Sequence, residues 1–435
     1  MFSGTDILSI RPFEICSIRP PTENYSLTFR LTRNCHWKKC AFCPVYKVGA
    51  KYSRRGIDEI LEDIRRAKLM DDYLYEQGVG FPVYSSAAYS RIPDFADAVK
   101  AAQWEAGIFS EQAFEIGSLP RPESLDPRMA WFLSWFNSTP DIEQCMNHIV
   151  TWRISGGRTC FLGDADSLTH KPDFIKKVIG EIRLNFPGIS RFTVYGRTST
   201  AARIRSLKEL KSMAGAGLHR VHFGLESGCD TVLTMVNKGV SAEEQVAGCL
   251  KTKEAGLSCS VYVMPGLGGA AHSDANGHDT ARVLSRIGPD FIRLRSLEIF
   301  PMTALEEARK NGAFIEATEE LVVREIRILI EETDADTEIL SDSASNLLPI
   351  FGKLPRDRKG MLETIDEYLD LDPREKLEFS VRARIESFIG QYGELTEDII
   401  SLLAPCIKEN KLDFKNSDDT SLKNIISLIR SKLMP

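Results

Sequence analysis

Short stretches rich in β-branched and aromatic residues alternate with helical patterns along most of this 435-residue chain. Between the stretches, apolar side chains recur at helical spacing, as Ile175, Val178 and Ile182 do after Pro172. Strands that alternate with helices pair in parallel through right-handed crossovers. The sequence therefore predicts an α/β fold, either an open doubly wound sheet or a complete or partial barrel, with functional groups at the C-terminal ends of the strands. The six expected strands are residues 26–31, 159–162, 192–195, 220–223, 258–263 and 291–297.

Two regions depart from this alternation. Residues 71–150 contain the Pro-rich stretch LPRPESLDP and are expected to form an insertion or cap. After about residue 315 we expect no further strands, only helices at 319–332, 358–369, 373–391, 397–407 and 421–433. We therefore divide the chain into an N-terminal segment (1–23), an α/β core (24–315) and a helical C-terminal region (316–435).

The composition limits the class of protein. The chain is 43% hydrophobic and 27% charged, which is typical of a packed globular protein. A net charge of −6 disfavours binding to a phosphate backbone, so we consider nucleic acid an unlikely partner. The N-terminus lacks a basic segment followed by an apolar one, and no stretch is apolar enough to span a membrane. We expect a cytoplasmic protein.

Three of the ten cysteines, Cys35, Cys40 and Cys43, lie close together in NCHWKKCAFCPVYK, directly after the first expected strand. Structural zinc needs four protein ligands, and His36 is expected to point away from its neighbour Cys35. Thiolates also hold iron–sulfur clusters, and in a four-iron cluster three cysteines would leave one iron open to an exogenous ligand. Zinc and unliganded thiols remain open as alternatives.

The cysteine segment resembles the cluster loop of the radical S-adenosylmethionine (radical SAM) superfamily, including an aromatic residue, Phe42, just before the third cysteine. Most members have C-x3-C-x2-C, and this chain has one extra residue between Cys35 and Cys40. The order of further motifs after the second to fifth strands is also similar, and the branch containing the Elongator catalytic subunit and anaerobic coproporphyrinogen oxidase is the most similar one. These motifs are FLGDADSL, YGRTST, HFGLESGCDTVLTMVNKG and VMPGLGG.

The resemblance implies a partial (β/α)6 TIM-like barrel that binds a [4Fe–4S] cluster and S-adenosylmethionine. It implies Cys35, Cys40 and Cys43 as the ligands of the cluster. It implies no particular catalytic residue. The residues expected to contact S-adenosylmethionine are Phe42, Gly163 and Asp164 (amino group), Arg197 and Ser199 (carboxylate), Glu226 (ribose), and Pro265 and Gly266 (adenine).

The resemblance also implies an oxygen-sensitive enzyme that takes an electron from reduced flavodoxin or ferredoxin. The cofactor would be cleaved to methionine and a 5′-deoxyadenosyl radical, which abstracts hydrogen from the substrate. Arg293 and Arg295 share one face of the last expected strand. They either bind an anionic small molecule inside the barrel or pair with acidic residues outside it.

Two other functions stay open at this point. The first is transfer of the aminocarboxypropyl group of S-adenosylmethionine by cleavage of a different C–S bond. The second is a non-catalytic metal-binding or electron-transfer protein. The substrate, the oligomeric state and the meaning of the extra loop residue do not follow from the sequence.

Overall fold

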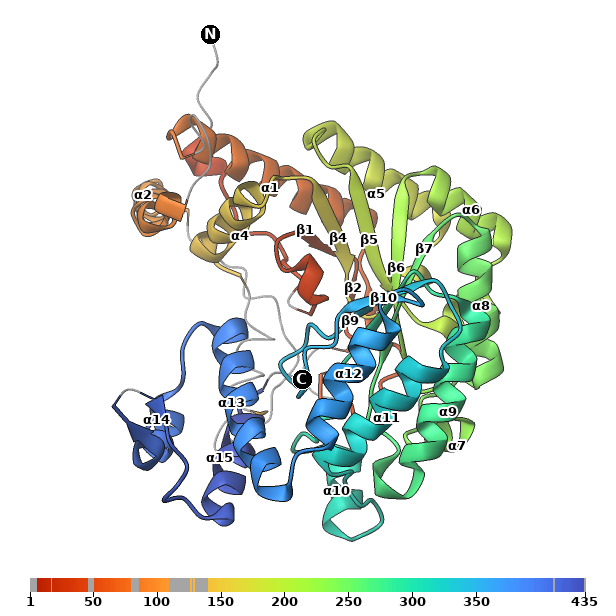
Figure 1. Ribbon diagram of the computed structural model, residues 1–435. Coiled ribbons are helices and arrows are strands. Elements are labelled where there is room, and N and C mark those ends of the chain that lie inside the picture. The colour runs from red at the N-terminus through yellow and green to blue at the C-terminus, as the bar shows by residue number, and fades with distance from the viewer. Residues whose placement is uncertain are drawn as a thin grey trace.

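The structure is a computed structural model, and it describes residues 6–16, 18–45, 51–79, 86–108, 126, 128–129, 140–409 and 411–433. In this part of the chain, one eight-stranded sheet forms the centre of the molecule and helices cover its outer side (Figure 1). The strands follow one another in the order β1 (Leu27–Arg30), β4 (Thr159–Gly163), β5 (Arg191–Gly196), β6 (Leu218–Glu226), β7 (Ser258–Val263), β8 (Phe291–Leu294), β9 (Thr337–Leu340) and β10 (Gly352–Leu354).

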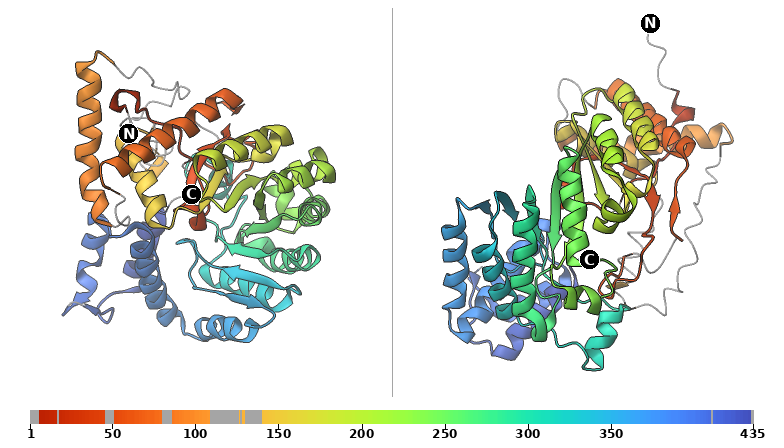
Figure 2. Two further views of the ribbon diagram at one scale, coloured as in Figure 1. Left: turned by 90° about the horizontal axis from the view of Figure 1, so that it is seen from above. Right: turned by 90° about the vertical axis from the view of Figure 1, so that its right-hand side faces the viewer.

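Each neighbouring pair from β1 to β9 is parallel, and β10 is antiparallel to β9. The sheet curves, with its helices outside, as Figure 2 shows from above. Its edge strands β1 and β10 do not pair with each other, so the barrel is incomplete. The expected α/β fold with a partial barrel is confirmed.

The helices on the outer side begin and end where local sequence signals place them. Helix α5 begins at Pro172 and buries the face that carries Ile175, Val178 and Ile182 against the sheet. Helix α8 begins with a capping box in which Ser241 and Glu244 bond each other's backbone N–H groups. The outer helices are α1 (Ile57–Glu76), α5 (Pro172–Asn185), α6 (Leu207–Gly215), α8 (Ala242–Glu254), α9 (Gly269–Ile287), α11 (Glu319–Glu332) and α12 (Arg358–Leu369).

The prediction that strands end near residue 315 was wrong. Helix α11 coincides with the expected helix at 319–332, but it connects β8 to β9 within the barrel. Strand β9 is short and follows the acidic stretch EETDAD, and β10 has only three residues. Neither strand has the long apolar run that marks a buried strand in a sequence. Backbone pairing with the edge of the sheet stabilises both strands instead.

The region 71–150 is only partly among the described residues, and LPRPESLDP lies almost wholly outside them. Helix α1 continues into this region as far as Glu76. Helices α2 (Ile92–Glu105) and α4 (Ile142–Ile154) follow, and α4 contacts α1, α2 and β1. The described part of the region is therefore a helical layer beside the first strand.

The C-terminal helices α13 (Pro373–Tyr392), α14 (Glu397–Leu403) and α15 (Asp419–Ser431) have an apolar core of their own. A short hairpin, β11 (Ile407–Lys408) and β12 (Lys411–Leu412), connects α14 to α15. None of the helices in the described part of the chain combines the length and apolar character needed to cross a membrane.

Candidate functional site

A cavity opens where β5, β6, β7 and β8 end. It is lined by Arg197 just after β5, Glu226 at the end of β6, Met264 after β7 and Arg295 after β8. Side chains that leave parallel strands at their C-terminal ends converge on one edge of the sheet, which is where barrels of this kind carry their functional groups. The cavity therefore lies where the sequence places the site.

The cluster loop, residues 34–45, lies between β2 (Thr32–Arg33) and β3 (Ser53–Arg54) and forms one wall of this cavity. Cys35, Cys40 and Cys43 all line it, and the first two are buried. The N–H of Ala41 donates to the carbonyl of Val236 (2.8 Å), and the N–H of Leu305 donates to the carbonyl of Ala41 (3.0 Å). The loop is thus fixed between the helix α7 (Asp230–Met235) and the helix α10 (Ala304–Lys310).

The donor set of the loop discriminates between kinds of metal site. Within the described residues, no group of three His, Cys, Asp or Glu side chains is arranged around a single metal ion. His36 lies outside the cavity, with its ring centroid 5.7 Å from that of Tyr52 and its Nδ1 3.6 Å from the Asp166 carboxylate. Zinc requires its ligands around one ion, whereas a four-iron cluster takes each thiolate on a different iron. The three thiols sharing one cavity therefore fit a cluster.

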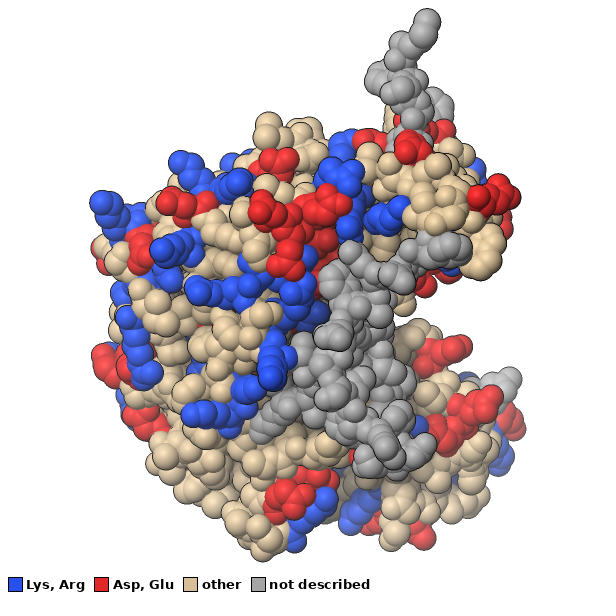
Figure 3. Space-filling model, turned by 180° about the vertical axis from the view of Figure 1, so that it is seen from behind, with Lys and Arg blue, Asp and Glu red and all other residues tan. Residues whose placement is uncertain are grey.

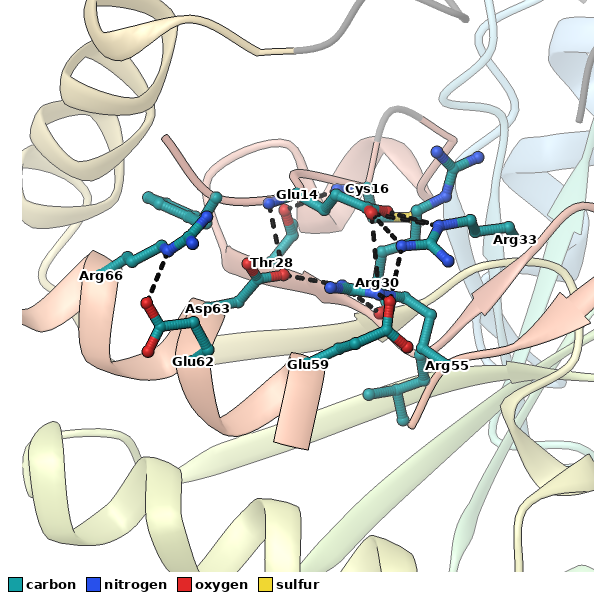
Figure 4. A network of polar contacts seen from close by, with 12 residues as sticks. Glu14, Cys16, Thr28, Arg30, Arg33, Arg55, Glu59, Glu62, Asp63 and Arg66 are labelled. Atoms are coloured by element: carbon teal, nitrogen blue, oxygen red, sulfur yellow. Dashed lines mark hydrogen bonds and ion pairs between the residues drawn. The ribbon is translucent and has the colours of Figure 1, made fainter. Parts of the chain in front are cut away.

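A charged network holds the chain directly before the cluster loop and directly after β3 (Figure 4). Arg33, directly before the loop, pairs with Glu14 and Glu59. Arg55, directly after β3, donates to the buried carboxylate of Asp63 at 2.7 Å. Burial raises the pKa of Asp63 to about 6 although Arg55 opposes this shift. The loop is therefore anchored to α1 and to the N-terminal segment.

Gly163 and Asp164 at the end of β4 do not line the cavity, whereas Ala165 does. The Asp164 carboxylate is buried and accepts a hydrogen bond from Arg30 at 2.9 Å. A Cβ atom on Gly163 would lie 2.1 Å from Sγ of Cys16, so only glycine fits there. Gly163 and Asp164, the residues expected to contact the cofactor, thus support Ala165, which lines the cavity.

Arg197 lines the cavity, and its guanidinium is fixed from several sides. It donates to the carbonyl of Lys238 (2.6 Å) and to the hydroxyl of Ser199 (3.3 Å). It also lies 5.2 Å from the ring centroid of Trp37 in the cluster loop. Ser199 is buried and does not line the cavity, so it orients Arg197.

Trp37 also docks the lengthened part of the cluster loop on the turn after α7. Its indole N–H donates to the carbonyl of Asn237 at 2.8 Å. Its ring covers Gly239, where a Cβ atom would lie 2.1 Å from the ring and the φ angle of +73° also favours glycine. The four residues between Cys35 and Cys40 thereby bring an aromatic ring under Arg197.

Glu226 and Lys238 form an ion pair at the cavity wall. The Lys238 Nζ lies 2.8 Å from Oε1 of Glu226, and both residues line the cavity together with Phe42. A Cβ atom on Gly224 would lie 2.3 Å from the same carboxylate oxygen, so the glycine makes room for it. Of this motif, the sequence predicted Glu226 and missed Lys238 as a cavity residue.

Pro265 and Gly266 do not line this cavity, and their neighbour Met264 does. The carbonyl of Pro265 accepts from the N–H of Leu297 (2.9 Å), and the N–H of Gly266 donates to the carboxylate of Glu325 (3.1 Å). The two residues shape the turn that presents Met264.

Arg293 and Arg295 lie toward the interior of the barrel, which is the first of the two positions considered from the sequence. Their surroundings differ. Arg293 is 1% exposed, pairs with Asp342 and donates to the hydroxyl of Thr22. Arg295 lines the cavity. Arg293 therefore pairs with an acidic residue, but inside the barrel, which neither expectation described.

The comparison with known families agrees with this geometry. Residues 134–277 match the model of the Radical SAM superfamily. The matched residues, about a third of the chain, thus resemble a radical SAM domain. The match begins beyond the three cysteines, so their assignment depends on their place in the cavity.

Individual relatives of this chain are distant. A curated relative, the tRNA uridine(34) acetyltransferase of Methanocaldococcus infernus, is 27% identical over 122 residues, which are 28% of this chain and 23% of that protein. The chain thus spans less than a quarter of the length of the curated relative it matches.

Solved structures give low TM-scores, so the fold description depends on the strand order given above. The Methanocaldococcus infernus Elp3 lacking residues 1–46 is 18% identical (TM-score 0.36; 55% of this chain, 60% of that one). Methylornithine synthase (PylB) is 11% identical (TM-score 0.36; 82% and 85%). Coproporphyrinogen III oxidase (HemN) from Escherichia coli is 15% identical (TM-score 0.30; 63% and 78%).

Enzymes of the Radical SAM superfamily, whose model residues 134–277 match, bind a [4Fe–4S] cluster and S-adenosylmethionine. The three thiols on one cavity fit the cluster, and Arg197 and Glu226 on the same cavity fit a zwitterionic nucleoside cofactor. The cavity residues that sequence reasoning missed include Tyr195, Lys238, Tyr262, Met264 and Glu298. Tyr195, Lys238 and Met264 lie within the quoted motifs, and alternation along the strand would have pointed to Tyr262.

A buried carboxyl connects the two turns after β6 and β7. Glu325 on α11 accepts hydrogen bonds from Gly266, from Ser273 (3.1 Å) and from the amide of Asn276 (2.7 Å). The side-chain oxygen Oδ1 of Asn276 accepts a hydrogen bond from the hydroxyl of Ser227, the residue after Glu226. Burial raises the pKa of Glu325 to about 8, against the effect of its three donors.

We expect the pH dependence of stability to change in Glu325→Gln. The folded-state pKa lies above the ordinary value of 4.5, so the folded protein keeps a proton that the unfolded chain releases. This stabilisation is complete below the unfolded pKa and is lost as the pH rises through the folded one. The free energy of unfolding of wild type should therefore fall by about 3 kcal/mol relative to the variant between pH 5 and 8. Urea titrations at both pH values measure it, and parallel pH profiles would contradict it.

Proposed function

We propose that this enzyme cleaves S-adenosylmethionine reductively and abstracts hydrogen from an anionic small-molecule substrate. When bound, the [4Fe–4S] cluster and S-adenosylmethionine supply the electron and the 5′-deoxyadenosyl radical for this reaction. The observation that carries the proposal is that Cys35, Cys40 and Cys43 share one cavity with Arg197, Glu226 and Arg295. Thiolates for a cluster, a cation for a carboxylate and a carboxylate for ribose hydroxyls thus open onto the same space.

The residues of the cavity divide into a cofactor side and a substrate side. On the cofactor side, Arg197 binds the carboxylate of the methionine moiety, and Ser199 and the Lys238 carbonyl hold Arg197 in place. Glu226 would accept hydrogen bonds from the ribose hydroxyls, and Lys238 orients its carboxylate.

Residues that do not line the cavity act through their neighbours. Gly163 and Asp164 fix Ala165, whose backbone would hold the amino group of the cofactor. Pro265 and Gly266 fix Met264, which would cover the adenine together with other apolar side chains, and Phe42 lines the same cavity as the third thiol.

The substrate side is formed by Arg295 with Tyr195, Tyr262 and Phe300. Aromatic walls exclude water from the space in which hydrogen is abstracted, which protects a reactive radical from side reactions. Burial raises the pKa of Tyr262, so its phenol stays neutral and Arg295 supplies the positive charge. A carboxylate or phosphate on the substrate would meet this guanidinium.

We expect Arg295→Ala to lose anion binding and Arg293→Ala to lose stability instead, because Arg293 neutralises Asp342 away from the cavity. Small carboxylates and phosphates would be screened by the rise in Tm that they give the reconstituted wild type. An anion found in this way should bind roughly ten-fold more weakly to Arg295→Ala. Equal stabilisation of wild type and Arg295→Ala by that anion would refute the assignment.

The function itself is tested by anaerobic reconstitution followed by two measurements. The EPR signal of the reduced cluster should change on addition of S-adenosylmethionine, and incubation with a reductant such as dithionite or reduced flavodoxin should release 5′-deoxyadenosine and methionine. Methylthioadenosine as the product would show aminocarboxypropyl transfer instead. A signal indifferent to S-adenosylmethionine would overturn the proposal in favour of an electron-transfer or metal-binding role.

A further inference from the structure

The cluster loop has an inner and an outer face. Its inner face carries Cys35 and Cys40, which are buried against the cavity. Its outer face carries Lys38 and Lys39, which are both exposed and make no salt bridge with any described residue. Within the part of the chain that the structure describes, the exposed Lys39 directly precedes the buried Cys40.

Basic side chains continue from the loop in one direction along the turn after α7. The Lys39 Nζ lies 5.0 Å from the ring centroid of Trp37, and that ring covers Gly239. The carbonyl of Gly239 accepts from the exposed guanidinium of Arg203, which also pairs with Glu244.

The same surface continues on the other side of the loop through the segment around β3. The ring of His36 contacts that of Tyr52, and the hydroxyl of Tyr52 bonds that of Thr169 at 3.3 Å. The exposed Arg54 donates to the carbonyl of Thr169, and Lys51 is exposed directly before Tyr52. We call Lys38, Lys39, Lys51, Arg54 and Arg203 the basic face.

The charge of this face is opposite to that of the whole chain. All five members are exposed, and among described residues only Arg203 pairs with a carboxylate. The chain as a whole has a net charge of −6. β2 and β3 project toward the rear of the molecule (Figure 2), and Lys and Arg side chains gather on that side (Figure 3). A local field of this sign steers an acidic partner to this side.

We propose that the basic face is the docking site of a small acidic protein that carries one electron and reduces the cluster behind the loop. The inference rests on the proposed function, since only a reducible cluster requires such a partner. One electron leaves the carrier and one enters the cluster, and no atom is exchanged. Encounters between redox proteins bury little area and depend on charge, which suits a face made of mobile lysines and arginines.

The test measures how fast reduced flavodoxin, as the acidic probe, reduces the reconstituted full chain in a stopped-flow instrument. Lys38→Glu with Lys39→Glu should lower the second-order rate constant by about ten-fold or more at low ionic strength, and the wild-type rate should fall as salt is added. Lys51→Glu with Arg54→Glu, outside the cluster loop, should act in the same direction.

The matched control is Lys408→Glu with Lys411→Glu, two exposed lysines that face each other in the C-terminal hairpin. This variant should be reduced at the wild-type rate. Dithionite should reduce all variants to the same extent, with the same EPR change on addition of S-adenosylmethionine. Failure of that change in wild type would overturn the proposed function, whereas equal flavodoxin rates in wild type and both basic-face variants would overturn the docking site alone. Binding of an RNA oligonucleotide to this face, with unchanged flavodoxin rates, would also overturn it.

Discussion

Replacing any one of Cys35, Cys40 and Cys43 by alanine is expected to reduce the iron and sulfide content of the reconstituted protein to near zero. The three thiols line one cavity, and in the proposed function each would bind a different iron of the cluster. Loss of one would leave two ligands and a second iron without a protein ligand. Iron and sulfide analysis after anaerobic reconstitution measures the effect.

The control is Cys406→Ala. Cys406 is also buried, but it lies in the apolar core of the C-terminal helices, and its thiol contacts the hydroxyl of Ser417. This variant should keep the full iron content and lose only a little stability, since a small side chain is shortened. Wild-type iron content in all three cluster-loop variants would contradict the assignment of the cluster to this loop. One tightly bound zinc ion in place of iron would contradict it as well.

The strands that the sequence predicted are those with a local signature. Strand β7 ends at Val263, as expected. Its side chains are buried on both faces of the sheet, so the sequence shows a short run of apolar and small residues that marks the strand. In contrast, β9 owes its place to parallel pairing with β8, which aligns Ile292 with Ile339 across about fifty residues of chain. No local pattern encodes such a pairing, so the barrel was predicted to be shorter than it is.

The candidate site was predicted to the level of the motif but not always of the residue. Arg197 and Glu226 line the cavity as expected, since each directly follows or ends a strand. Asp164 does not line the cavity, because its carboxylate pairs with Arg30 of the neighbouring strand β1, 134 residues earlier in the chain. The sequence identifies the turn after β4, but a long-range ion pair decides which of its residues reaches the cavity.

The extra residue in the cluster loop is an example of a feature that only the structure explains. From the sequence it is a lengthening of the common C-x3-C spacing. In the folded protein the loop carries Trp37 over Gly239 and beneath Arg197. The same turn supplies the Lys238 carbonyl that binds Arg197, so loop, turn and guanidinium form one contact unit.

That unit makes Arg197 the residue whose loss should most weaken cofactor binding. We expect Arg197→Ala to raise the Kd for S-adenosylmethionine by about 10- to 150-fold, which corresponds to about 1.5–3 kcal/mol for a hydrogen bond to a charged group. Arg197→Lys should recover only part of this loss, because an ammonium lacks the planar fork that bonds Ser199, the Lys238 carbonyl and a carboxylate together. Calorimetric titration of the reconstituted proteins measures the three constants.

The iron content of each variant separates a binding role from a merely structural one. Arg197 is not a ligand of the cluster, so Arg197→Ala should keep its iron while its EPR signal requires more S-adenosylmethionine to change. Arg203→Ala is the matched control, because Arg203 contacts the same turn through the Gly239 carbonyl but does not line the cavity. An unchanged Kd in Arg197→Ala would refute its role. A loss of affinity that only parallels a loss of iron would show instead that Arg197 holds the cluster loop in place.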